Sequence, residues 1–142
     1  MTLLERALQL ALSIHAGQTD RAGRPYILHP LTLMMQMDTD DERITAVLHD
    51  TIEDSDTTIN QLQQKLNLPP HIAEAVDLLS HDKTEMDYDS YVKRLAANPL
   101  ARKVKLADLR HNMDLTRLDE IDDKVMPRLA KYHRAWQLLN GR

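Results

Sequence analysis

The stretch ITAVLHDTIED, residues 44–54, carries an apolar run directly into four ionisable side chains. Its apolar residues recur at three- and four-residue steps, which predicts a helix with a buried face. If that helix continues to the end of the stretch, His49 and Glu53 share one face, and Asp50 and Asp54 share another. Three carboxylates and one imidazole this close together repel or desolvate one another unless solvent or a cation compensates. The stretch therefore predicts a solvated helix end or a cation site, and the buried run before it favours the cation site.

In two further segments a histidine or an aspartate stands next to apolar residues. His29 stands directly ahead of Pro30, and Asp108 follows the run VKLA of residues 104–107. An aspartate buried in this way needs a partner, and a metal ion is one such partner. Together with the stretch above, these segments supply two nitrogen and two oxygen donors for one divalent metal ion. The candidate metal ligands are His29, His49, Asp50 and Asp108.

Glu53 and Asp54 remain as carboxylates that the metal ion does not need. A divalent ion beside two spare carboxylates suits metal-assisted hydrolysis, in which a carboxylate orients water and takes its proton. The chain has no cysteine, and half of the donor set is oxygen, so we expect manganese, with another divalent metal as the alternative. The sequence thus predicts Glu53 and Asp54 as catalytic residues.

The rest of the chain predicts one all-α domain. Its 142 residues can form a single buried core, and with no Phe and seven Met that core must come mainly from aliphatic residues and Met. No segment shows the two-residue period of a strand. Capping boxes that indicate helix starts are Thr2 with Glu5, Thr39 with Glu42, and Thr58 with Gln61. Further helices are expected over residues 70–80, 87–97, 99–117 and 122–139, with a long loop over residues 15–26.

Composition limits the partners and the compartment that we expect. A formal net charge of −4 without a polybasic run argues against binding of polymeric nucleic acid or of an anionic membrane surface. No stretch approaches about 18 consecutive apolar residues, and the N-terminus makes a poor signal peptide, so we expect a cytoplasmic protein without a membrane span. A second His–Asp pair, His81 and Asp82, is expected to be solvated in a surface turn. The sequence leaves the oligomeric state open.

Four ordered blocks of the chain resemble a known family. They are HAGQ at residues 15–18, GRPYILHP at 23–30, LHDTIED at 48–54 and VKLADLRHNM at 104–113. These blocks are similar to the HD-domain phosphohydrolases and, more narrowly, to the hydrolase domain of the Rel/SpoT-type alarmone enzymes and its stand-alone small relatives. The resemblance implies an HD-domain helical bundle over residues 1–142 that holds one manganese ion. It also implies hydrolytic removal of the 3′-pyrophosphate from guanosine tetra- or pentaphosphate.

The same resemblance assigns roles to individual residues. It implies that the four candidate ligands bind manganese, that Glu53 and Asp54 position and activate the attacking water, and that Asn112 contacts the nucleoside. The chain departs from the family where two adjacent basic residues are usual, because Asp20 and Arg21 stand there. Arg21 can still meet a phosphate or a base, whereas Asp20 would repel a phosphate. This departure bears on the substrate more than on the hydrolytic chemistry.

Spacing around the proposed ligand Asp108 points to residues that bind a small nucleotide. Lys105 precedes Asp108 by three residues and Asn112 follows it by four, so both share its helix face. Arg21 lies in the glycine-bearing loop and offers a planar fork for phosphate. We therefore expect Arg21, Lys105 and Asn112 to bind substrate, with extension of Lys105 into solvent as the alternative.

Three functions follow from these patterns. The first is a manganese-dependent (p)ppGpp 3′-pyrophosphohydrolase. The second, motivated by Asp20, is a phosphohydrolase of another small nucleotide or phosphate ester. The third is a catalytically silent module that senses a nucleotide or a metal, and the presence of Glu53 and Asp54 beside a full ligand set disfavours it.

Overall fold

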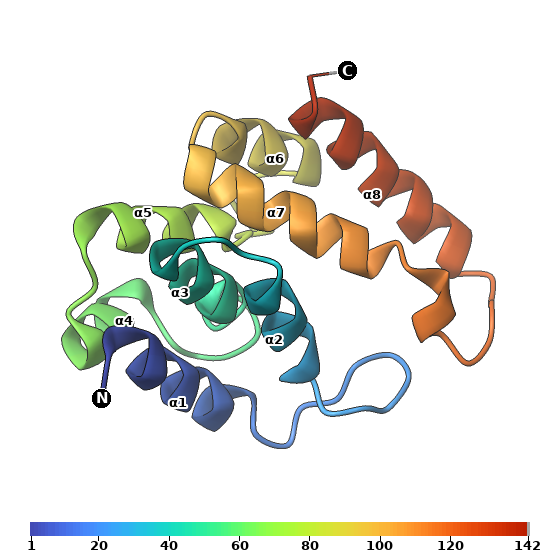
Figure 1. The fold of residues 1–142 in the computed structure, drawn as a ribbon. Helices are drawn as coiled ribbons and strands as arrows, with labels where there is room; N and C mark the ends of the chain where they lie inside the picture. The colour runs from blue at the N-terminus through green and yellow to red at the C-terminus, as the bar shows by residue number, and fades with distance from the viewer. Residues whose placement is uncertain (142) are drawn as a thin grey trace.

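This computed structural model describes residues 1–141, which form eight α-helices and one short 3-10 helix joined by loops (Figure 1). The expected all-α fold is confirmed, since β-structure in these residues is limited to one isolated bridge inside a loop. None of the described helices is both long enough and apolar enough to cross a bilayer. The elements are α1 (Leu3–His15), α2 (Leu28–Met35), α3 (Asp40–Leu48), α4 (Ile59–Leu66), α5 (Pro70–Leu79), α6 (Tyr88–Ala96), α7 (Pro99–Asn112), η1 (Leu115–Arg117) and α8 (Val125–Leu139).

The three predicted capping boxes all form and begin α1, α3 and α4. At α3, the Thr39 hydroxyl accepts a hydrogen bond from the Glu42 backbone N–H at 3.2 Å, and the Glu42 carboxylate accepts one from the Thr39 N–H at 3.1 Å. The same reciprocal pair is present at the starts of α1 and α4. These bonds satisfy backbone donors that have no partner within the helix. Local sequence therefore determines where these three helices begin.

The helix that was expected to reach residue 54 ends six residues earlier, at Leu48. The Thr51 hydroxyl donates to the Leu48 carbonyl at 2.8 Å, and the Thr51 N–H also bonds that carbonyl, at 3.1 Å. The Ser55 hydroxyl likewise donates a hydrogen bond to the Thr51 carbonyl, at 2.5 Å. These side chains compete for carbonyls that would otherwise continue the helix. The acidic residues of the stretch consequently lie on turns and not on a helix face.

Two other helices are shorter than expected. The helix predicted over residues 99–117 ends at Asn112 and is followed by the separate 3-10 turn η1. The helix predicted to start at residue 122 starts at Val125, because the Asp122 side chain accepts a hydrogen bond from the Lys124 N–H and forms a turn first. The helix α2 was not predicted at all. Its eight residues are mostly apolar around the whole helix and show no helical period.

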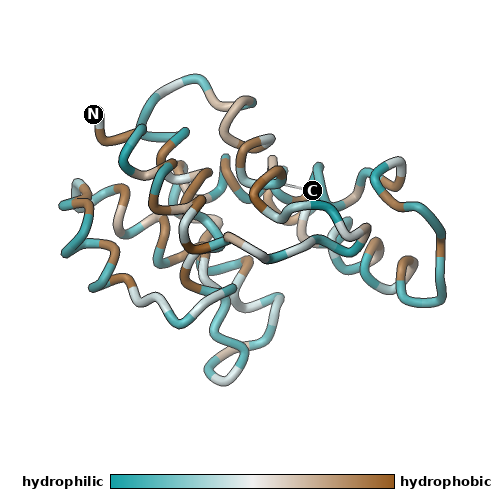
Figure 2. The backbone as a smooth tube through the Cα atoms, turned by 90° about the horizontal axis from the view of Figure 1, so that it is seen from below, coloured by the Kyte–Doolittle hydropathy of each residue, from teal (hydrophilic) through white to brown (hydrophobic). Residues whose placement is uncertain are grey.

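Two clusters of buried aliphatic side chains hold the helices together. One joins α2, α6, α7 and α8 with parts of α3 and α5, and the other joins α1, α3, α4 and α5. The short helix α3 contributes to both, through Ala46 to the first and through Val47 and Leu48 to the second. Helical segments carry most of the hydrophobic residues, whereas the connecting loops are mostly hydrophilic (Figure 2). The C-terminal end of α3 is thus fixed from both sides, and His49 follows directly from it.

Candidate metal centre and active site

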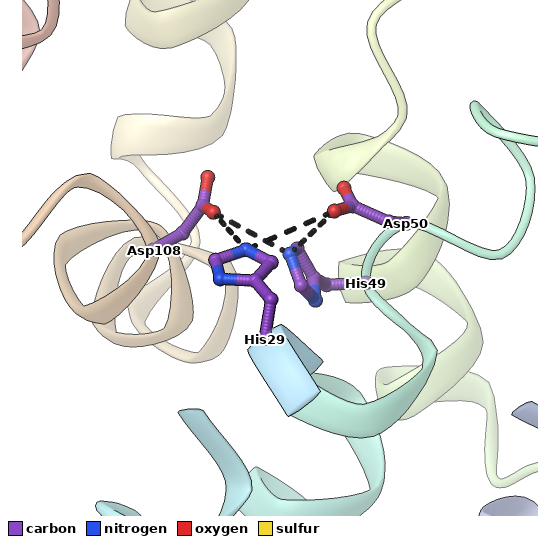
Figure 3. Close-up of side chains that lie close together, drawn as sticks. All are labelled: His29, His49, Asp50 and Asp108. Atoms are coloured by element: carbon purple, nitrogen blue, oxygen red, sulfur yellow. Dashed lines mark hydrogen bonds and ion pairs between the residues drawn. The ribbon is translucent and has the colours of Figure 1, made fainter. Parts of the chain in front are cut away.

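Four side chains from separate parts of the chain meet at one point of the fold (Figure 3). His29 lies on α2, His49 directly follows α3, Asp50 begins the next turn, and Asp108 lies on α7. One nitrogen or oxygen atom from each lies within 4.8 Å of the corresponding atom of every other. The two histidines and Asp108 are buried, and Asp50 is partly buried. The structure therefore brings together the four residues that the sequence predicted as ligands.

The spacing within this cluster fits a divalent cation. His29 Nε2 lies 2.8 Å from Asp108 Oδ1 and 3.9 Å from Asp50 Oδ2. His49 Nε2 lies 2.9 Å from Asp50 Oδ2 and 3.5 Å from Asp108 Oδ1, yet it is buried and has no well-oriented hydrogen-bond partner among the described residues. A buried nitrogen in that condition is costly. A cation between the two imidazoles and the two carboxylates would satisfy it, so the donor set fits one divalent metal ion.

Contacts behind the cluster orient both imidazoles. The His49 Nδ1–H donates to the Ala46 carbonyl at 2.7 Å, which leaves Nε2 facing the carboxylates. Without a metal ion Nε2 keeps a proton because, against the effect of burial, Asp50 and Asp108 raise the pKa of His49 well above its ordinary value, and a bound ion would displace that proton. The Nδ1 atoms of His29 and His111 lie 2.7 Å apart. Burial, with the nearby Arg117 guanidinium, lowers the pKa of His111 to about 4. His111 is then neutral and accepts the His29 Nδ1–H, so that His29 Nε2 also faces the cluster.

Strong charge interactions run through the cluster even without a metal ion. Burial opposes ionisation, but the attraction of His49 and His29 lowers the pKa of Asp50 to about 2. Burial likewise opposes the ionised form of Asp108, whereas Lys105 and the two histidines hold its pKa well below the usual range. The Lys105 ammonium donates to Asp108 Oδ2 at 2.8 Å and is itself buried. Both carboxylates are therefore ionised at neutral pH, which is the state that binds a metal ion.

Glu53 and Asp54, the predicted catalytic acids, are exposed and face the cavity beside the cluster. Glu53 Oε1 accepts a hydrogen bond from the His81 backbone N–H at 2.7 Å, so this carboxylate is tied to the segment between α5 and α6. Burial and the neighbouring charges of Asp50 and Glu53 raise the pKa of Asp54 to about 6. A carboxyl with that pKa can exchange a proton near neutral pH.

The cavity above the cluster has a volume of about 490 Å³. All three predicted substrate-binding residues, Arg21, Lys105 and Asn112, line it. Two of them already contact Asp108, since the Asn112 side-chain amide donates to Asp108 Oδ1 at 3.0 Å and Lys105 donates to Oδ2. The expectation that Lys105 extends into solvent is not met, because only 8% of this residue is exposed. Arg21 is exposed and lies in the loop between α1 and α2.

The sequence interpretation missed four residues that belong to the site. His81 was expected to be solvated, but it is half-buried, lines the cavity and stacks on Tyr91 with ring centroids 4.7 Å apart. Its neighbour in sequence, Asp82, is exposed as expected. No periodic pattern in the sequence indicates the four missed residues, because each joins the site through contacts that form only when the chain folds. The missed residues are Tyr26, whose hydroxyl donates to Asp50 Oδ2, His81, His111 and Arg117.

Comparison with known proteins places the chain among the Rel/SpoT group. It is 34% identical over 124 residues to the bifunctional (p)ppGpp synthase/hydrolase SpoT of Escherichia coli K12, a match over 78% of this chain and 17% of that protein. It is 32% identical over 126 residues to a GTP pyrophosphokinase of Streptomyces coelicolor, and 29% identical over 119 residues to a guanosine-3′,5′-bis(diphosphate) 3′-pyrophosphohydrolase of Aquifex aeolicus. Each of these two also matches 78% of this chain, with 14% and 17% of the relative covered. No protein-family model matches the chain.

A solved structure shares the fold. It is described as a metazoan ortholog of SpoT that hydrolyses ppGpp, and it superposes with a TM-score of 0.78 at 19% sequence identity. The match covers 98% of this chain and 85% of that chain. The all-helical bundle with its buried cluster of two histidines and two aspartates agrees with the HD-domain architecture that the sequence resemblance implies. The resemblance found in the sequence is confirmed, and the protein is Rel/SpoT-like, spanning less than a fifth of the curated relatives that it matches here.

Proposed function

We propose that residues 1–142 form one HD-type domain that removes the 3′-pyrophosphate of guanosine tetra- or pentaphosphate in a metal-dependent reaction. One observation carries the proposal, namely that a buried two-histidine, two-aspartate cluster with an unsatisfied His49 Nε2 lies under a cavity edged by two further carboxylates. The names of the relatives point to the same chemistry, although some of them are named as synthases. Metal-assisted hydrolysis requires such a cluster, and the carboxylates beside it can orient and deprotonate water.

In this proposal His29, His49, Asp50 and Asp108 hold manganese. Two carboxylates and two neutral imidazoles suit Mn²⁺ better than a thiolate-preferring ion, and another divalent ion remains the alternative. The bound ion supplies Lewis acidity, which makes water more acidic and polarises a phosphoryl oxygen. The Nδ1 hydrogen bonds of both histidines turn their Nε2 atoms toward the two carboxylates, so that both could bind an ion there after loss of any Nε2 proton.

Glu53 and Asp54 have different roles toward the attacking water molecule, since Glu53 orients it and Asp54 accepts its proton. Glu53 keeps a fixed position because one of its oxygens accepts the His81 N–H, so its other oxygen can orient a water molecule. Asp54 has a pKa of about 6 and takes the proton from that water. The two carboxylates are adjacent in sequence and edge the same cavity, which allows both to contact one molecule.

The cavity also carries groups that suit a nucleotide polyphosphate. Its lining includes acids near the metal ligands, and basic side chains that can meet phosphate oxygens. Tyrosine rings in the same lining can stack on a base. The lysines and arginines of the lining are Arg21, Lys83, Lys105, Arg117, Arg128 and Lys131, and the tyrosines are Tyr26, Tyr88, Tyr91 and Tyr132.

A second candidate function follows from Asp20, which lines the cavity with its carboxylate where a basic residue would favour phosphate. That observation favours a less highly charged nucleotide or phosphate ester as substrate. A panel of nucleotides that includes the 3′-pyrophosphorylated guanosines, tested with manganese-loaded protein, separates the two. Pyrophosphate release from the guanosine substrates supports the first function, and orthophosphate release from another compound supports the second. Binding of a nucleotide without release of either product identifies a silent sensor.

A further inference from the structure

Arg117 holds a fixed position in the wall of the cavity. It ends the 3-10 helix η1, and its Nη1 donates to the His111 carbonyl at 2.9 Å. Its Nη2 lies 3.7 Å from Asp20 Oδ2, which is too far for a hydrogen bond but close enough for charge attraction. About a quarter of the side chain is exposed, and the residue lines the cavity. A guanidinium has five N–H donors, so most of them remain available to a ligand in the cavity.

Asp20 owes its place to a tight turn. Its Oδ1 accepts hydrogen bonds from the N–H groups of Ala22 at 2.9 Å and Arg24 at 3.0 Å. Gly23 adopts a left-handed backbone conformation with a φ of 82°, which allows the turn to close. This leaves Oδ2 directed at Arg117 from the other side of the cavity rim. The acid that replaces a basic residue thus serves as the counter-ion of a cation supplied by η1.

The position of Arg117 relative to the metal cluster makes it a contact for substrate. It bonds the backbone of His111, and the His111 ring lies against His29, one of the four candidate ligands. A nucleotide held by its pyrophosphate at the metal would bring negative charge within reach of this guanidinium. We propose that Arg117 binds a phosphate group of the nucleotide, and that Asp20 occupies it as a counter-ion until the substrate enters. This inference rests on the proposed function, because it takes a nucleotide phosphate as the ligand.

The same contacts would also be present if Arg117 only held two loops together, a role that we call a structural clasp. Arg24 allows this role and substrate binding to be separated. Arg24 donates to the Arg117 carbonyl at 3.1 Å and to Asp119 Oδ1 at 3.2 Å, so it joins the same two loops. Its side chain is half exposed and is not part of the cavity lining. Loss of Arg24 therefore loosens the clasp and leaves the cavity charge unchanged.

The test compares Arg117→Gln with Arg24→Gln in manganese-loaded protein that also carries Glu53→Gln, a change expected to keep the ion and to stop turnover. Protein with Glu53→Gln alone is the reference and takes the place of the wild type. Calorimetry measures binding of guanosine 3′,5′-bisdiphosphate, of inorganic pyrophosphate and of uncharged guanosine, while thermal unfolding reports on the fold. We expect Arg117→Gln to weaken both phosphate ligands about tenfold or more, because a charge-assisted hydrogen bond is lost. Guanosine binding stays unchanged, and Arg24→Gln affects none of the three. Arg117→Lys, which keeps the charge but loses the fork, gives an intermediate loss and replaces the Gln variant if that one fails to fold.

Equal weakening by Arg24→Gln and Arg117→Gln, or none by Arg117→Gln, overturns the assignment in favour of a clasp. Asp20→Asn provides a second measurement, since asparagine keeps the turn and removes the charge. We expect it to tighten binding of both phosphate ligands at least twofold, and weaker binding would overturn the counter-ion role. If the reference protein binds pyrophosphate but not guanosine 3′,5′-bisdiphosphate, the proposed substrate is wrong. The role of Arg117 is then judged from the effect of its substitution on pyrophosphate binding. Binding of neither phosphate ligand by the reference protein overturns both proposals.

Discussion

His29 and His111 share one proton between their Nδ1 atoms, which lie 2.7 Å apart while the two rings are parallel within 8°. His111 is the acceptor, because its lowered pKa of about 4 keeps it neutral. The hydrogen bond therefore runs from His29 Nδ1–H to His111 Nδ1, and Nε2 of His29 faces the carboxylates of Asp50 and Asp108. A contact between α2 and α7 thus selects the tautomer that can bind a metal ion.

Removal of that acceptor should weaken metal binding. We expect His111→Ala to lower manganese affinity about 10- to 100-fold, the usual effect of losing a hydrogen-bond partner of a ligating histidine. His111→Gln keeps an acceptor oxygen and should lose less. The matched control is His133→Ala, because His133 is exposed on α8. Calorimetric titration with Mn²⁺ measures all three variants, and wild-type affinity in His111→Ala would refute the orienting role.

Metal binding and turnover should respond differently to loss of the two kinds of carboxylate. Asp108→Ala and Asp50→Ala are expected to lose the metal ion and activity together, because each removes a donor from the four-residue cluster. Glu53→Gln should keep the metal ion and lose turnover by about 10²- to 10⁴-fold, since it removes a group that handles water. Elemental analysis beside rate measurement distinguishes these results. A metal-free Glu53→Gln protein would make Glu53 a ligand.

Local signals in the sequence were enough to predict the starts of three helices and the fold class. The starts at Thr2, Thr39 and Thr58 depend on side chains within three residues of each helix start, so they can be recognised without tertiary structure. The helix α2 could not be predicted in this way, because apolar residues also stand at its exposed positions, such as Leu28 and Met35, so the sequence shows no helical period. The early end at Leu48 depends on hydroxyl contacts that compete with helix continuation, and periodicity does not record them.

The candidate site was predictable where each residue follows an apolar run that fixes it in the core. Asp50 and Asp108 both have such runs before them, and they meet as expected. His111 and Arg117 were missed because their roles arise from the packing of α7 and η1 against other segments. His81 was misread as solvated, since its stacking partner Tyr91 lies in the next helix, ten residues away. Such contacts have no sequence period.

The buried pair of Lys105 and Asp108 gives a further prediction, about stability. Lys105 is buried, donates to Asp108 Oδ2 at 2.8 Å and lies 5.2 Å from the centroid of the Tyr91 ring. Lys105→Met removes the cation and leaves a buried carboxylate without its partner, which typically costs about 3–5 kcal/mol. Denaturant unfolding of the metal-free protein measures this loss. Lys103→Met is the control, since Lys103 lies two residues away and pairs with the more exposed acids Asp38 and Glu42. Equal stability of the two variants would contradict the prediction.

The last prediction concerns His15, a buried histidine at the end of α1. Its Nδ1 lies 2.7 Å from Gln18 Oε1 and donates to it, while its Nε2 is buried and has no hydrogen-bond partner among residues 1–141. Protonation would place a second N–H at Nε2 with nothing to accept it, and burial accordingly lowers the pKa of His15 below its ordinary value. The unfolded chain, in which this pKa is about 6.5, then binds more protons than the folded one just below that pH.

The contribution of His15 to the stability of the metal-free protein should therefore fall as the pH drops below about 6.5. Replacement of His15 by Gln, which cannot titrate, should reduce this loss, whereas His133→Gln on the exposed side of α8 should not. Urea unfolding at pH 7 and pH 5.5 gives the free energies of unfolding for the wild type and both variants. The prediction fails if His15→Gln and the wild type lose the same stability between these two pH values, because His15 would then contribute nothing to the acid sensitivity of the fold.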